Sequence, residues 1–193
     1  MGPSLPAPPS PRERILAAAS ELFYRKGIPN VGINEIIATS DVARMTLYHH
    51  FASKDELVLA SLTRRSERRR SDIVAAIAGA RTHRCKILAV FDYLKRVVAD
   101  SGFRGCVFVN AAAECPDPID GVRRLAAAHK AWIAAQFESV ARAAGWRHPG
   151  LLAEQLMVLY DGAIVGAYLK RSAQPVVAAA AAAKVLLTTA AKR

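Results

Sequence analysis

Apolar residues recur every three or four positions along most of this chain, which is the spacing of one face of an α-helix. The first such stripe follows Ser10-Pro11-Arg12-Glu13, which has capping-box spacing with proline at the first helical position. Gly27 supplies a C-terminal stop. We therefore expect a first helix between Ser10 and Gly27, and its buried stripe is Ile15, Leu16, Ala19, Leu22 and Phe23.

Two short helical patterns come next. One spans about residues 34–39 and the other residues 42–50, with Ser40-Asp41 as the turn between them. Val42 and Leu47 are placed to face inward, which leaves the other side chains of the second pattern largely available. Two short helices joined by a tight turn and packed on a longer one form a helix-turn-helix.

The rest of the chain is also helical in pattern. Ser53 and Glu56 have capping-box spacing and open a long helix that extends to about Ala78. Further helices are expected over residues 86–99, 105–114, 119–144 and 151–170, and from Pro175 onward. The predicted fold is all-α, with a disordered proline-rich tail (1–11), an N-terminal three-helix helix-turn-helix DNA-binding domain (12–62) and a C-terminal helical ligand-binding and dimerisation domain (63–193).

The positive charge lies mostly outside the predicted helix-turn-helix. The 193 residues carry a net charge of +11, which suggests a polyanionic partner. Residues 1–62 contain six basic and six acidic groups, whereas residues 63–84 contain seven and two, and residues 85–193 contain fourteen and eight. The run Arg64, Arg65, Arg68, Arg69, Arg70 could be a phosphate patch or a solvated helix face. We favour the solvated face, because these positions lie two to four turns beyond Lys54.

Several classes of protein are disfavoured by what the chain lacks. It has no Gly-rich phosphate loop, nucleophile elbow or metal-spaced cluster, so we expect no enzyme, no cofactor and no metal site. The longest apolar stretch, residues 156–169, is too short to span a bilayer, and residues 1–11 do not resemble a signal peptide. We expect a soluble cytoplasmic protein without a membrane partner.

The three cysteines have no CxxC spacing. Reduced, buried thiols are the expectation for Cys85, Cys106 and Cys115. A redox switch through Cys106 and Cys115 is the alternative.

The N-terminal motif resembles that of TetR-family transcriptional repressors. The resemblance is carried by Ile15-Leu16-x-x-Ala19-x-x-Leu22-Phe23, the Gly27 stop, Ile36, and Thr46-Leu47-Tyr48-x-His50-Phe51 with Lys54 and Leu57. It covers about residues 12–62. Beyond them, residues 105–110 and Asp161-Gly162 look like regulatory-domain segments of one large subgroup.

The resemblance implies an all-α homodimer that binds a palindromic operator in double-stranded DNA and is released by a small-molecule effector. By matching position, Thr46, Tyr48 and Lys54 would hold phosphates, and Asn34 would lie near the DNA. Base edges would be faced by Arg44, Met45 and His49. The chain departs from the family pattern at two positions. Gly32 stands where a capping Ser or Thr is usual, and Asp41 replaces the usual turn glycine.

The effector pocket is expected between the helices after residue 80, lined mainly by apolar side chains for a largely apolar ligand. The polar candidates are Asn110 and Asp161, and Asp161 could bind an arginine across the dimer or a cationic ligand. The apolar and aromatic candidates are Phe91, Phe103, Phe108, Trp132, Met157 and Tyr160.

Two helices rich in small residues are expected to form the dimer interface. They span residues 151–170 and 175–190, and Gly162 and Gly166 would let another helix approach closely. The alternative is that both helices pack within one subunit. The alternative function is a ligand-independent DNA-binding or protein-interaction module.

Overall fold

The computed structural model describes residues 8–115 and 120–190, and it contains nine helices and no strand in these residues. The predicted all-α fold is therefore confirmed. The helices are α1 (Pro11–Lys26), α2 (Ile33–Ser40), α3 (Arg44–His50), α4 (Lys54–Ala78), α5 (His83–Val98), α6 (Val107–Glu114), α7 (Asp120–Ala143), α8 (Pro149–Lys170) and α9 (Gln174–Thr189). Residues 1–7 of the predicted tail lie outside the described residues.

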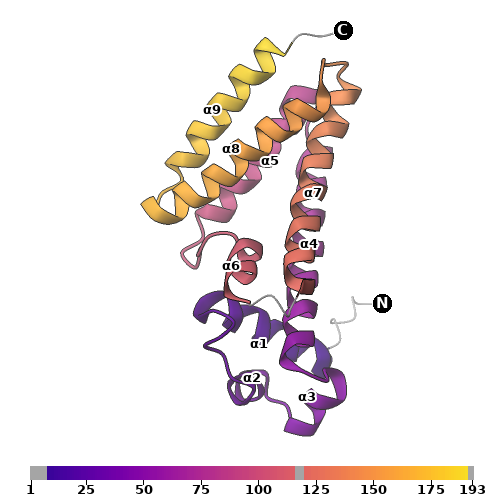
Figure 1. Cartoon of the computed structure of the whole chain (residues 1–193), viewed down its shortest axis with the longest axis vertical. Coiled ribbons are helices and arrows are strands. Elements are labelled where there is room, and N and C mark those ends of the chain that lie inside the picture. Colours follow the sequence, from indigo (N-terminus) through magenta and orange to yellow (C-terminus); the bar gives the residue numbers. More distant parts are fainter. Residues whose placement is uncertain (1–7, 116–119, 191–193) are drawn as a thin grey trace, which may run out of the picture.

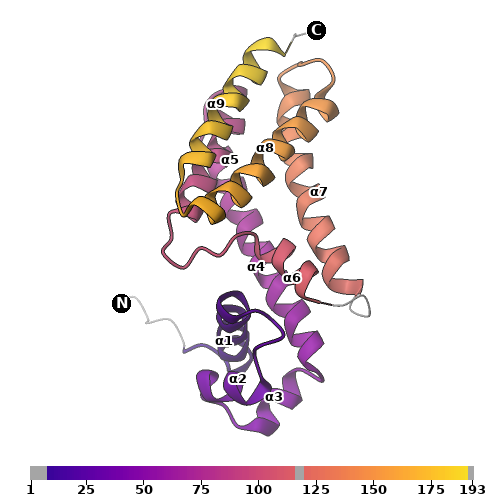
Figure 2. The same cartoon turned by 60° about the vertical axis from the view of Figure 1, so that its left-hand side comes forward.

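The first three helices form a small group at one end of the elongated molecule (Figures 1 and 2). The α1 capping box is present, because Ser10 Oγ accepts the Glu13 N–H and the Glu13 carboxylate accepts the Ser10 N–H. The predicted turn is also present, with Asp41 in the left-handed conformation at φ 51°. Helix α3 begins at Arg44 rather than at Val42, because the chain is still extended at Ala43 after this turn.

Helix α4 connects the two ends of the molecule. Its first half packs on α1, and its second half packs on α5 and α7 (Figure 1). The core of the N-terminal end also includes Phe108 from α6 and Val122 from α7. Apolar packing is therefore continuous across residue 62, where the sequence analysis placed the domain boundary.

Helices α5, α7, α8 and α9 form the bundle at the other end. Helices α5 and α8 begin two or three residues before their predicted first residues, 86 and 151. Thr82 caps α5 by accepting the Cys85 N–H, and Pro149 occupies the first turn of α8.

The two glycines of α8 differ in their surroundings. At Gly166 a Cβ would lie 2.9 Å from the Pro175 Cβ, so this glycine serves the packing of α9 within the subunit, whereas Gly162 faces open space.

Helix α8 is longer than its apolar stretch suggested. It spans 22 residues and is long and apolar enough to cross a membrane by length and composition alone, a test that the core helix of a soluble protein also passes. It packs between α7 and α9 in this structure and buries eight of its side chains. The apolar stretch 156–169 is only part of this helix, which begins before it, at Pro149.

Gly27 generates a testable prediction about stability. Its φ of +84° is strained for any residue with a Cβ, and an added Cβ would lie 3.3 Å from the Glu114 carboxylate oxygens. Gly27→Ala should lower the free energy of unfolding by about 1–3 kcal/mol in urea titrations. Gly79→Ala is the matched control, because Gly79 caps α4 at φ −71° and its Cβ would make ordinary contacts. Equal losses in the two variants would contradict this explanation.

Candidate functional site

Helix α3 presents a polar surface at the end of the molecule. Leu47 is fully buried, whereas Met45 is 77% exposed and Tyr48 is 42% exposed. Arg44 and His49 are also exposed, and Thr46 is half-buried. The structure therefore places all five predicted α3 residues on or near one accessible surface, with Leu47 anchoring the helix from behind.

The predicted residues at the edges of this surface already have partners within the chain. The Arg44 guanidinium donates to the Asn34 carboxamide oxygen on α2. The Lys54 ammonium donates to the Ile28 carbonyl at 2.7 Å. Because an ammonium has three hydrogens, Lys54 keeps two for another acceptor. Arg44 likewise retains donors, since a guanidinium carries five N–H groups.

Both departures from the family pattern have a structural account. Gly32 is the extended N-cap residue of α2, at φ −87°, and it provides no side-chain cap. A Cβ at Gly32 would meet nothing within 4 Å. Asp41 takes the left-handed turn conformation, and Arg14 Nη1 donates to its carbonyl at 2.9 Å.

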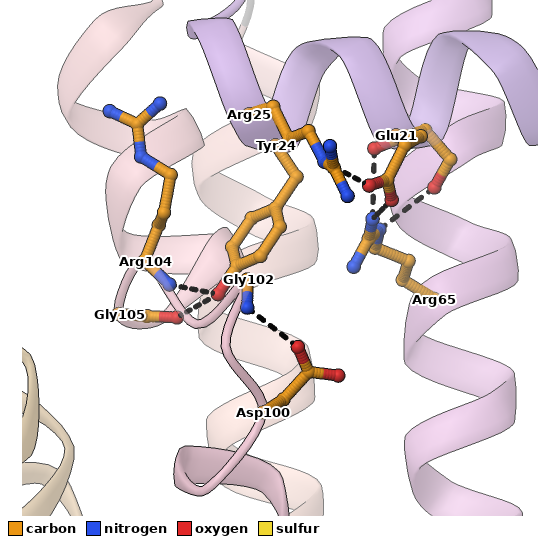
Figure 3. Close-up of polar contacts among 9 residues, drawn as sticks. Glu21, Tyr24, Arg25, Arg65, Asp100, Gly102, Arg104 and Gly105 are labelled. Atoms are coloured by element: carbon orange, nitrogen blue, oxygen red, sulfur yellow. Dashed lines mark hydrogen bonds and ion pairs between the residues drawn. The ribbon is translucent and has the colours of Figure 1, made fainter.

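A polar junction joins this end of the molecule to α6, and no local sequence pattern predicts it. The Tyr24 hydroxyl accepts the Arg104 N–H at 2.6 Å and donates to the Gly105 carbonyl at 3.1 Å (Figure 3). Burial raises the pKa of Tyr24, so this hydroxyl keeps its proton. Glu114 at the end of α6 accepts the Ile28 N–H at 2.7 Å. These partners are about 80 residues apart in sequence, and no local pattern links them.

Arg65 braces the same junction from α4. Its guanidinium donates to the Ser20 hydroxyl at 2.8 Å and to the Ser20 carbonyl at 2.9 Å, and it lies 4.8 Å from the centre of the Tyr24 ring. Arg70 lies over the Trp132 ring in a similar way. The arginine run of α4 is therefore only partly the solvated face that the sequence favoured.

Three of the predicted effector residues line one small cavity among α5, α6, α7 and α8. Phe103, Phe108 and Tyr160 surround a space of about 20 Å³. This volume is about that of a single water molecule. The other residues that line it include Leu94, Ile133 and Ile164.

The remaining five effector candidates do not line this cavity. Phe91 is fully buried against Phe137 and Tyr160, and Met157 lies in the same core. Trp132 is half-buried beside Arg70. The helical spacing of these three residues is equally typical of side chains that pack in a core and of side chains that contact a ligand.

The two polar anchors have partners within the subunit. Asn110 lies beside a separate space of about 30 Å³ next to α1 and α4, where its amide donates to the Arg104 carbonyl at 2.8 Å. Asp161 forms an ion pair with Lys130 on α7, and its side chain is 47% exposed, so the carboxylate is partnered and solvated without a ligand.

His129 also lines this cavity, although it was not among the predicted effector residues. Its Nδ1 lies 2.8 Å from Ser66 Oγ, and its ring stacks on Phe108 with 3.9 Å between centroids. Burial, together with the charges of Lys130, Arg69 and Arg70, lowers the pKa of His129 to about 3. The imidazole is therefore neutral at physiological pH.

The structure corrects two expectations about the cysteines. Cys85 is exposed rather than buried, while Cys106 and Cys115 are half-buried. Cys106 and Cys115 cap opposite ends of α6. Nine residue steps along a helix separate their Cα atoms by roughly 13 Å, which is too far for a disulfide. Among the described residues no group of His, Cys, Asp and Glu is placed to hold a metal ion.

Comparison with known proteins identifies the N-terminal motif and the whole fold. Residues 15–61 match the family model described as bacterial regulatory proteins, tetR family. A TetR-family transcriptional regulator from Streptomyces coelicolor has 32% sequence identity and a TM-score of 0.87, over 93% of this chain and 95% of that one. A TetR-type regulator from Streptomyces avermitilis also has 32% identity, with a TM-score of 0.80 over 96% of this chain and all of that one.

A named relative is the HTH-type transcriptional repressor NemR of Escherichia coli. It is 27% identical over 114 residues, which are 58% of this chain and 57% of NemR. The match to the S. coelicolor regulator, by contrast, extends over nearly the full length of both chains. The chain belongs to the TetR family of transcriptional regulators, which bind DNA and are not enzymes.

Proposed function

We propose that this regulator is a homodimeric repressor that binds a palindromic operator and is released by a small-molecule effector. The exposed surface of α3, backed by buried Leu47, is the observation that carries the proposal. A helix of this kind enters the major groove, with two half-sites about 34 Å apart along the duplex. NemR, named a repressor, supports the direction of regulation. A regulator that acts on DNA works in the bacterial cytoplasm.

Within this proposal the residues that face the DNA divide into two groups by their chemistry. Thr46, Tyr48 and the two free hydrogens of Lys54 contact phosphates and set the register. Arg44 reads a base edge, with Met45 and His49 beside it and Asn34 holding its guanidinium.

An exposed apolar stripe on α8 supports the proposed dimer. Val158 is 72% exposed and Leu169 is 73% exposed, although most apolar side chains of this helix are buried. Leu151 and Val165 belong to the same stripe, at a spacing of seven residues from Val158. Val177 and Val185 are further exposed apolar side chains, on α9. A second copy that packs α8 and α9 against this surface would form a four-helix interface.

Helix α6 offers a route from the effector cavity to the DNA-binding end. Phe108, near its start, lines the cavity, and Glu114, at its end, holds the Ile28 N–H. A ligand that favours a displaced α6 would therefore reposition α1 and the helices packed on it. Such a ligand must bind the displaced state more tightly, since equal affinity for both states shifts nothing.

The small volume of the cavity favours one alternative, a regulator that binds DNA without an effector. The two possibilities differ in a direct measurement. A ligand-independent regulator would keep its operator affinity throughout an effector screen.

The proposed roles of α3 predict different effects for two substitutions. Arg44→Ala should cost about 1–3 kcal/mol of operator binding and relax the preference at one base pair. Tyr48→Phe should weaken binding to all sequences alike, because it removes a phosphate donor and keeps the ring. Fluorescence anisotropy on an operator selected from random DNA, and on its single-base variants, measures both. An equal loss on every sequence for Arg44→Ala would remove this residue from the base-reading role.

Replacing Gly32 should increase stability and operator affinity rather than decrease them. A serine there would fit the extended backbone and the open space, cap α2 and offer a hydroxyl to phosphate. Gly32→Ser should raise the free energy of unfolding by a few tenths of a kcal/mol and tighten operator binding. Gly32→Ala adds the same Cβ without the hydroxyl and is the control. A tighter complex with alanine would show that the hydroxyl is not the cause.

The proposed interface predicts the effect of a charge on α8. Val158→Glu should convert the dimer to a monomer in light scattering and weaken operator binding, because it buries an unpaired carboxylate. Val74→Glu is the control, since Val74 is an exposed valine on α4, away from the stripe. A Val158→Glu variant that stays dimeric would place the interface elsewhere.

A further inference from the structure

A groove of about 540 Å³ lies between α1, α4 and α5, beside the polar junction (Figure 3). Its walls carry three carboxylates, Glu21, Asp72 and Asp100. They carry twice as many guanidinium groups, those of Arg25, Arg64, Arg65, Arg68, Arg69 and Arg96. The groove is therefore strongly basic, and the basic groups come from three different helices.

The three carboxylates do not neutralise this groove. Glu21 pairs with Arg25 and lies 3.7 Å from Arg65. Asp72 accepts the Tyr93 hydroxyl at 3.4 Å, and Asp100 accepts the Gly102 N–H at 2.7 Å.

The remaining arginines of the groove have no carboxylate partner. In the part of the chain that the structure describes, no carboxylate lies within 4 Å of Arg64, Arg68, Arg69 or Arg96. Burial and the neighbouring charge of Arg69 lower the pKa of Arg65, which agrees with an excess of positive charge here. The groove therefore has more guanidinium groups than carboxylates, and an anionic ligand could pair with the excess.

Arg69 is the point where this groove meets the apolar cavity. It is half-buried, and with Val97 and Phe103 it lines both spaces. Its charge acts on Tyr93 at the groove and on His129 and Tyr160 at the cavity. On one side of Arg69 lie guanidinium groups that have no carboxylate partner, those of Arg68 and Arg96. On the other side lie the apolar side chains of Phe108, Ile133 and Ile164.

We propose that this composite site binds an amphiphilic anion. Its phosphate-type headgroup lies among Arg68, Arg69 and Arg96, and its hydrocarbon tail passes Phe103 into the space between α5, α6, α7 and α8. The inference rests on the proposed function, since it names the chemical class of the effector. Several converging guanidiniums suit a multiply charged headgroup, because each can donate two parallel hydrogen bonds to its oxygens.

The same geometry explains how such a ligand would act. The cavity of about 20 Å³ is too small for a hydrocarbon tail, so entry of a tail requires its lining, Phe103 included, to move apart. Phe103 is next to Arg104, and Arg104 and Gly105 are the two partners of the Tyr24 hydroxyl. Displacing this segment breaks the contact between α1 and the loop before α6. The ligand and the intact junction therefore exclude each other.

The groove does not suit a second contact with operator phosphates. Arg68 lies fourteen residues beyond Lys54 on α4, which is roughly 21 Å along the helix axis. A duplex seated on α3 would therefore contact phosphates near Lys54 and leave the groove accessible. A ligand can bind there while the protein is on DNA.

Titration calorimetry of the full chain without DNA tests the proposal. The probe is dodecyl phosphate below its micellar concentration, and dodecanol, dodecanoate and inorganic phosphate are the comparisons. Dodecyl phosphate should bind at least about tenfold more tightly than dodecanol or inorganic phosphate, since charged hydrogen bonds and tail burial both contribute. Weaker binding of dodecanoate would identify a phosphate-type headgroup, whereas tighter binding would overturn that choice in favour of a carboxylate.

Variants separate a built site from general basicity. Arg68→Gln combined with Arg69→Gln should weaken dodecyl phosphate binding by about tenfold or more. Arg81→Gln, which removes one guanidinium charge outside the groove, should leave it unchanged. Thermal melts by circular dichroism check that both proteins fold. Undiminished binding by the double variant, or equal losses in both, would overturn the proposal.

The operator assay distinguishes this inference from the proposed function. Dodecyl phosphate should release wild-type protein from its operator and fail to release the double variant. Operator binding without any dodecyl phosphate binding would overturn the amphiphile and keep the regulator. Dodecyl phosphate binding to a protein that selects no operator would support the site and overturn the proposed function instead.

Discussion

The backbone of Ile28 is held from two sides by charged groups, and the position of the DNA-binding end depends on this arrangement. Glu114 of α6 accepts its N–H, and Lys54 of α4 donates to its carbonyl. Gly27 makes the approach of Glu114 possible, because its positive φ and missing Cβ leave space for the carboxylate. One peptide segment thus joins α1, α4 and α6, and none of the three can move alone without losing a charge-assisted hydrogen bond.

A second connection, through Tyr24, joins α1 to the other end of α6. Its hydroxyl holds the loop before α6, while Ile28 holds the end of the same helix. Helix α6 is short and contacts the N-terminal core through Phe108 and Ala111. A displacement of its first turn therefore reaches both connections, whereas the α8–α9 packing lies in a separate core cluster.

The arginine run of α4 combines several roles that composition alone cannot separate. Arg65 is a structural residue that stacks on Tyr24, and Arg70 packs on Trp132. Arg68 and Arg69 line a groove without carboxylate partners of their own among the described residues. Helical periodicity distributes these side chains to different faces, so one run of like charges serves both packing and recognition.

The sequence by itself determined the order of the helices, the caps at Ser10 and Ser53, the turn at Asp41 and the family, because each depends on residues within a few positions of one another. Leu47 as the buried anchor of α3 followed from the same local periodicity. Only the tertiary structure decided the partners of Glu114, Lys54, Tyr24 and Asp161 and the contents of the cavity. Buried hydrogen bonds and ion pairs depend on which distant side chains the packing brings together, and helical spacing alone does not distinguish a core aromatic such as Phe91 from one that lines a cavity, such as Phe108.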